Sequence, residues 1–105
     1  MMFSHRVDFT ALPWQQAMPG VRHKVLDQAG KRMRLVEYTP EMEPHWCEKG
    51  HSGYLLAGRF EIEFPDRTET YDPGDGLIML PGREHKHRAK ALTDVVSVFF
   101  VEDLD

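Results

Sequence analysis

Turn-forming residues divide most of this chain into short segments, and their spacing constrains the fold more than any other feature. From Val21 onward a turn signal recurs roughly every 8–12 residues, a spacing typical of all-β sandwiches and barrels. The signals are Gly30, Thr39-Pro40, Pro65-Asp66, Pro73-Gly74 and Pro81-Gly82. No segment between them keeps the apolar period of about 3.6 residues that an amphipathic helix needs. We therefore predict an all-β chain.

The segments between these turns alternate as strands do. The expected strands lie within 21–26, 33–38, 54–64, 69–71, 77–80, 85–91 and 95–101. The clearest alternation places Phe60, Ile62 and Phe64 on one face, with charged residues between them. In 33–38, side chains two residues apart share a face, so Arg34, Val36 and Tyr38 point the same way. Segment 69–71 is expected to return as the hairpin partner of the strand before Pro65.

Length and composition indicate one globular domain. A chain of 105 residues can bury a single core, and 41% hydrophobic residues exclude a disordered chain. In 1–20 the apolar residues are scattered and interrupted by prolines, so we assign this segment to an extended N-terminal arm. Residues 21–105 form the domain itself.

Charge and cysteine usage narrow the possible partners and the compartment. The net charge of −4, with both signs interspersed, argues against a nucleic-acid partner. No run approaches the roughly 18 apolar residues of a membrane span, so no membrane partner is expected. The single cysteine excludes an internal disulfide. Since no export signal is recognisable, we expect a cytoplasmic protein.

Potential metal ligands gather in two short stretches of the sequence. The first holds His45, Cys47 and His51, and the second holds His85 and His87. Residues two apart in a strand share a face, so His45 can lie beside Cys47, and His85 beside His87. Imidazole and thiolate are preferred by zinc, nickel, copper and iron. Cys47 has an alternative role as a small buried apolar residue.

The spacing of these residues resembles the two sequence motifs of the cupin family. The first motif ends in H-x-H-x3-E-x6-G, and this chain has His45, Cys47, His51 and Gly58 at those intervals. Cys47 stands where the family has its second histidine, and His51 stands where it has glutamate. Thr39 occupies the position of the glycine that opens the motif.

The second cupin motif, G-x5-P-x-G-x2-H-x3-N, is matched at three positions. Gly74, Gly82 and His85 fall at its intervals, whereas Leu80 replaces the proline and Ala89 the asparagine. The resemblance covers 40–91. It implies a cupin-type double-stranded β-helix, or jelly-roll barrel, in 21–105.

The resemblance also implies a site for one divalent transition metal, Zn, Ni, Fe or Cu. Its expected ligands are His45, Cys47, His51 and His85, with His87 as the alternative to His85 or as a residue behind the ligands. Trp46 and Tyr54 flank these positions and are expected to line the mouth of the pocket, the alternative being packing. Glu48 is a weak candidate for a catalytic acid or base, as is Glu84, the alternative being solvated carboxylates.

The function expected from the resemblance is that of a small metal-binding cupin. Similar cupins are dioxygenases and isomerases that act on small organic molecules. The alternative is a non-catalytic module that binds a small molecule, with or without a structural metal, and a barrel whose pocket has lost its function is the third possibility. Whether the chain is an enzyme stays open. The apolar arm further suggests a homodimer in which the arm joins a neighbouring sheet.

Overall fold

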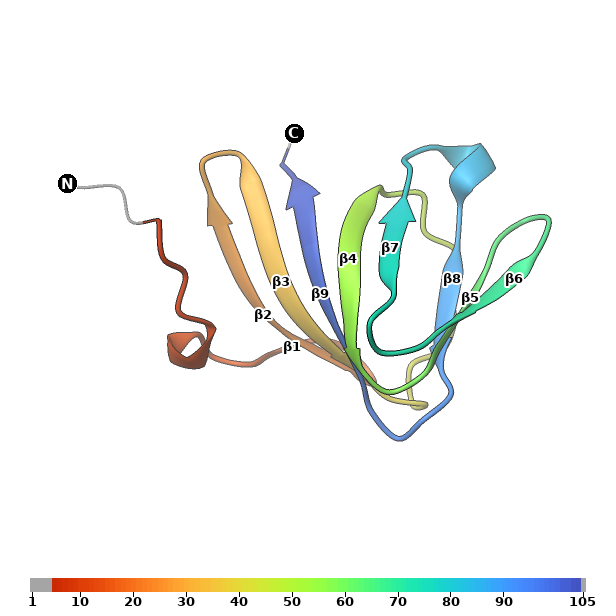
Figure 1. Ribbon diagram of the computed structural model, residues 1–105, viewed down its shortest axis with the longest axis horizontal. Helices are drawn as coiled ribbons and strands as arrows, with labels where there is room; N and C mark the ends of the chain where they lie inside the picture. The colour runs from red at the N-terminus through yellow and green to blue at the C-terminus, as the bar shows by residue number, and fades with distance from the viewer. Residues whose placement is uncertain (1–4, 105) are drawn as a thin grey trace.

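The computed structural model describes residues 5–104, which form two antiparallel sheets (Figure 1). The larger sheet has six strands in the order β1-β2-β3-β9-β4-β7, and the smaller has three in the order β6-β5-β8. The six are β1 (Gln15–Met18), β2 (Val21–Gln28), β3 (Lys31–Tyr38), β9 (Val96–Asp103), β4 (His51–Ala57) and β7 (Gly76–Met79). The three are β6 (Thr68–Tyr71), β5 (Phe60–Glu63) and β8 (Arg88–Ala91). The all-β prediction is confirmed.

Two of the expected strands differ in the structure. The run 54–64 is two strands in different sheets, because Gly58 at φ +83° turns the chain between β4 and β5. The segment 85–91 starts in a short 3-10 turn, η2 (Arg83–His85), and strand β8 begins only at Arg88. Pairing of β5 with β6 confirms the predicted hairpin.

The core lies between the two sheets, which converge at one end of the molecule and splay apart towards η2 (Figure 1). Val36, Val98 and Leu55 are 0% exposed and lie side by side across β3, β9 and β4. Phe60 and Ile62 of β5 are 1% and 2% exposed and belong to the same cluster. Burying each such side chain contributes about 1.5–3 kcal/mol. This apolar core fixes the register that positions the polar side chains further along the same strands.

The segment assigned to the arm contributes a strand to the large sheet. Strand β1 pairs with β2 of the same chain and forms one edge of the sheet. Before it, the 3-10 turn η1 (Phe9–Ala11) places Phe9 edge-on to Phe99, with ring centroids 5.7 Å apart. The arm thus packs against its own domain, and residues 1–4 of the predicted arm lie outside the described residues. Within residues 5–104 no helix is long and apolar enough to cross a membrane.

Candidate functional site

Cys47 and His87 lie directly opposite each other on neighbouring chain segments. The Cys47 amide donates to the His87 carbonyl at 2.8 Å, and the His87 amide donates to the Cys47 carbonyl at 2.9 Å. This isolated bridge joins the loop before β4 to the segment that leads into β8. His87 is 5% exposed and Cys47 is half-buried. The bridge therefore fixes a thiol and an imidazole side by side at the edge of the core.

The two side chains also interact electrostatically. A hydrogen bond with His87 lowers the pKa of the Cys47 thiol, and burial opposes this only in part. For His87, burial alone would lower the pKa, but the hydrogen bonds to Cys47 and to the His85 carbonyl outweigh it, so its pKa is raised. The opposite shifts favour a thiolate beside an imidazolium. A deprotonated Cys47 is the form that binds soft metals.

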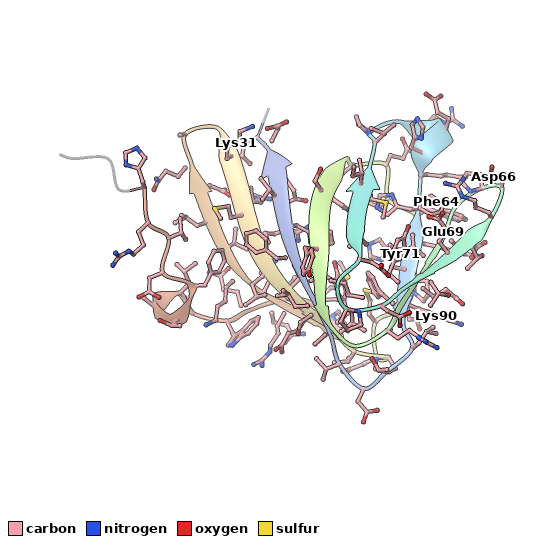
Figure 2. All side chains as sticks on the ribbon, in the orientation of Figure 1. Lys31, Phe64, Asp66, Glu69, Tyr71 and Lys90 are labelled. Carbon is pink, nitrogen blue, oxygen red and sulfur yellow. The ribbon has the colours of Figure 1, made fainter. Side chains whose placement is uncertain are left out.

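His51, the first residue of β4, packs against this pair. Its ring centroid lies 5.1 Å from that of His87 and 4.6 Å from that of Phe100. Phe64, which follows β5 directly and is labelled in Figure 2, has its ring centroid 6.5 Å from that of His87. We call Cys47, His51 and His87 the interior cluster. Its three members come from three segments, and the rings of Phe100 and Phe64 lie near its two histidines.

A part-buried ion pair flanks the interior cluster. Glu102 of β9 accepts two hydrogen bonds from Arg34 of β3, from Nε at 2.8 Å and from Nη2 at 2.9 Å. Glu102 Oε2 also lies 3.3 Å from His51 Nδ1, close enough for an ion pair but not aligned for a hydrogen bond. Burial on its own raises the pKa of Glu102, yet the contacts with His51 and Arg34 outweigh it and the pKa is lowered. Glu102 is therefore a carboxylate held beside His51.

His45 and His85 have different surroundings. His45 is exposed, and its Nδ1 lies 3.4 Å from the Glu43 carbonyl. His85 is the last residue of η2 and lines a recess of about 730 Å³. Residues from the β5–β6 turn and η2 form this recess, namely Pro65, Asp66, Arg67, Arg83, Glu84, His85 and Lys86. The ring contact between His51 and the alternative ligand His87 joins two of the predicted histidines.

The predicted pocket residues and carboxylates also lie elsewhere. Trp46 packs against Lys86 and Arg88, which are 4.8 and 4.7 Å from its ring centroid. Tyr54 is 49% exposed and lies opposite Phe99 in the register of β4 and β9, next to the buried Leu55. It therefore faces away from the core.

The two glutamates considered as acid or base are exposed. Glu84 lines the recess of about 730 Å³ beside His85, and the Glu48 carbonyl accepts a hydrogen bond from the Gly82 amide. The carboxylate beside the interior cluster is instead Glu102.

The donor atoms of the interior cluster are of the kinds that a soft metal prefers, but their present arrangement is not that of a metal site. One thiol and two imidazoles are the donors that zinc, nickel, copper and iron prefer. In the described part of the chain, however, no three His, Cys, Asp or Glu side chains are arranged to hold a metal ion. Their donor types fit a metal, and the side chains would have to turn towards one another to bind it.

Sequence reasoning missed Arg34 and Glu102, although the strand pattern contained the signal for both. Arg34 shares a strand face with Val36, which is fully buried. Glu102 lies two residues beyond Phe100, in the alternation of buried residues along β9. An arginine and a glutamate that continue buried faces of two strands are expected to pair if the strands are neighbours. The sequence did not indicate that β3 and β9 are adjacent.

Comparison with known proteins places this fold among the cupins. No protein-family model matches the chain, and no curated protein matches its sequence. Solved structures do match. The polyketide cyclase RemF from Streptomyces resistomycificus is similar with a TM-score of 0.76 and 22% identity, covering 98% of this chain and 81% of RemF. KdgF from Halomonas sp. has a TM-score of 0.68 and 23% identity, with 89% of each chain covered.

A third structure extends the match to lower identity. An RmlC-like cupin from Shewanella frigidimarina has a TM-score of 0.76 at 10% identity, covering 98% of this chain and 93% of that protein. At such identities the likeness establishes the fold and not the activity. The two antiparallel sheets, the order of their strands and these neighbours together identify the chain as a protein of the cupin fold.

Proposed function

We propose that this protein is a small metal-binding cupin in which Cys47, His51 and His87 hold one divalent transition metal, Zn, Ni, Fe or Cu. The observation that supports this is the gathering of one thiol and two imidazoles from three segments at the edge of the core. The proposal keeps Cys47 and His51 of the predicted ligand set and takes His87, the stated alternative, in place of His85. His45 and His85, the other two predicted ligands, lie outside the proposed set, and a variant of each tests that exclusion.

A bound metal would supply Lewis-acid chemistry, or redox chemistry if it were iron or copper. The chain's own groups would supply the rest. Glu102 would hold a negative charge beside His51, while Arg34 fixes that carboxylate in place. The rings of Phe100 and Phe64 lie against His51 and His87 on the apolar side of the cluster. A reducing compartment such as the cytoplasm would keep Cys47 available as a ligand.

The proposed substrate is a small organic molecule. RemF, a protein of the same fold, is a polyketide cyclase, and the sequence resemblance points to dioxygenase- or isomerase-like reactions. The second candidate function is a non-catalytic module that binds a small molecule. What favours this alternative is that no three donor side chains among residues 5–104 converge as metal ligands do. The metal content of the purified protein distinguishes the two candidate functions.

We expect the untagged protein, purified without chelator, to contain about one equivalent of a transition metal. His51→Ala and His87→Ala should each lose most of it, because each removes one of three donors. His45→Ala and His85→Ala are the matched controls and should retain it. Elemental analysis of the five proteins, with circular dichroism to verify folding, is the measurement. The assignment would be contradicted if His45→Ala and His85→Ala lost the metal while His51→Ala and His87→Ala retained it.

We also propose that the protein is a homodimer. Strand β1 forms an exposed edge of the large sheet, and Tyr54, Ile78 and Val101 leave an apolar patch on the outer face of that sheet. Ile78 is 76% exposed, and uncovered apolar patches on a sheet commonly mark contacts between proteins.

Sedimentation at micromolar concentration should return about twice the chain mass of 12.2 kDa. Ile78→Asp should shift the mass towards the monomer, because a charge would then lie in the contact. Leu92→Asp, which changes an exposed side chain after β8, should not. A monomer mass for the unmodified protein would rule out the dimer.

A further inference from the structure

Two neighbouring cations beside the small sheet have no carboxylate partner. Among residues 5–104, neither Arg83 nor Lys86 forms a side-chain hydrogen bond or an ion pair. The basic side chain opposite them is paired twice, since Arg67 lies 3.0 Å from an Asp66 oxygen and 3.4 Å from a Glu69 oxygen. The charges of Arg83 and Lys86 are therefore free to meet a ligand.

Both free cations line the recess of about 730 Å³ between the β5–β6 turn and η2 (Figure 1). The Lys86 amide closes the 3-10 turn by donating to the Arg83 carbonyl at 3.3 Å. Side chains three residues apart on a 3-10 turn lie one above the other, so the turn brings these two to one side. Sites for small molecules commonly measure about 300–1,000 Å³, and this recess falls within that range.

The recess is locally positive on a chain whose net charge is −4. Its charged lining consists of Arg67, Arg83 and Lys86 with Asp66 and Glu84. Because Arg67 is already neutralised by its carboxylate partners, two free cations face one free carboxylate, Glu84. The recess thus keeps a surplus of positive charge, which favours an anionic ligand.

The two cations offer complementary hydrogen-bond donors. Lys86 Nζ lies 4.8 Å from the ring centroid of Trp46, and this cation–π contact positions the ammonium without neutralising it. Arg83 presents the planar fork of N–H groups that matches a carboxylate or a phosphate. Pro65, also in the lining, provides an apolar surface for the rest of a ligand.

We propose that this recess binds the oxyanion group of a small organic molecule, a carboxylate or a phosphate monoester, between Arg83 and Lys86. The guanidinium holds two oxygens of the group and the ammonium binds it from the side. The inference goes beyond the proposed function and requires no metal.

The test is an NMR titration of the nitrogen-15-labelled protein in metal-free buffer with benzoate, phenyl phosphate and the neutral benzyl alcohol. We expect an anion to shift the amide signals of 66–67 and 83–86 until they saturate, and benzyl alcohol to leave them unchanged. Saturation at a lower concentration of phenyl phosphate identifies the oxyanion as a phosphate, and saturation at a lower concentration of benzoate identifies it as a carboxylate.

Three variants test the assignment of the charges. Arg83→Gln should weaken binding about tenfold, because it removes hydrogen bonds from a charged donor. Glu84→Gln should strengthen binding, since it removes the free carboxylate. Arg59→Gln is the matched control and should bind as the unmodified protein does, because Arg59 is exposed, pairs with Asp72 and does not line the recess.

The proposal would be overturned if neither anion gave saturating shifts, or if benzyl alcohol gave the same shifts as the anions. Equal weakening in Arg59→Gln and Arg83→Gln would also overturn it, because the anion would then respond to the overall charge and not to this recess. None of the variants alters Cys47, His51 or His87, so the titration gives its answer whether or not the interior cluster binds a metal.

Discussion

Replacing Phe60 by alanine should lower the free energy of unfolding by about 3–5 kcal/mol. Phe60 is 1% exposed, and its ring centroid lies 4.7 Å from that of Tyr38 on the opposite sheet. The substitution therefore removes a ring that joins the two sheets and leaves a cavity between them. Since domains of this size are stable by about 5–15 kcal/mol in total, the loss is a large fraction of that stability.

Urea denaturation measures this effect as a lower transition midpoint at an unchanged slope. Leu92→Ala is the control, because Leu92 is 42% exposed and surface truncations usually change stability by less than about 0.5 kcal/mol. A loss below about 1 kcal/mol for Phe60→Ala would mean that the ring does not hold the sheets together.

Gly58→Ala should be the second strongly destabilising change, by about 2–6 kcal/mol, with backbone strain and overpacking each contributing about 1–3 kcal/mol. Gly58 has φ +83°, and a Cβ built there would lie 2.2 Å from the Val95 carbonyl oxygen. Backbone atoms cannot move away as a flexible side chain can. The turn that moves the chain from β4 to β5, and so from one sheet to the other, depends on this glycine.

Gly30→Ala separates the two contributions. Gly30 has a similar φ of +76°, but a Cβ there would meet nothing within 4 Å. Gly30→Ala should therefore lower the free energy of unfolding only by the backbone strain, about 1 kcal/mol. Thermal unfolding of both variants measures the difference. Equal losses for the two glycines would show that the close approach to Val95 is not what requires glycine at position 58.

Local pattern in the sequence predicted most of the fold. The alternation of Phe60, Ile62 and Phe64 predicts a strand with one buried face, and the turn residues predict where the neighbouring strands end. The split at Gly58 was less evident, because apolar residues continue on both sides of it. A change of sheet is a long-range event, and only the close packing of Gly58 against Val95 reveals it.

The candidate site was less predictable for the same physical reason. The spacing predicts Cys47 and His51 as ligands together with either His85 or His87, and a local turn decides which of these two lies opposite Cys47. The 3-10 turn η2 ends at His85, so the backbone bridge to Cys47 forms two residues later, at His87. Glu102 and Arg34 join the site because β3 pairs with β9. Most of the chain separates these two strands in the sequence.

The most direct test of the interior cluster as a metal site is a cobalt(II) titration of the reduced protein followed by optical absorption. A thiolate ligand gives an intense charge-transfer band with cobalt, so the unmodified protein should show that band and saturate near one equivalent. Cys47→Ala should bind cobalt more weakly and without the band, and His85→Ala should keep it. A spectrum without charge transfer in the folded, reduced protein would contradict Cys47 as a ligand. A protein that takes up no cobalt would leave a metal-free binding module as the function.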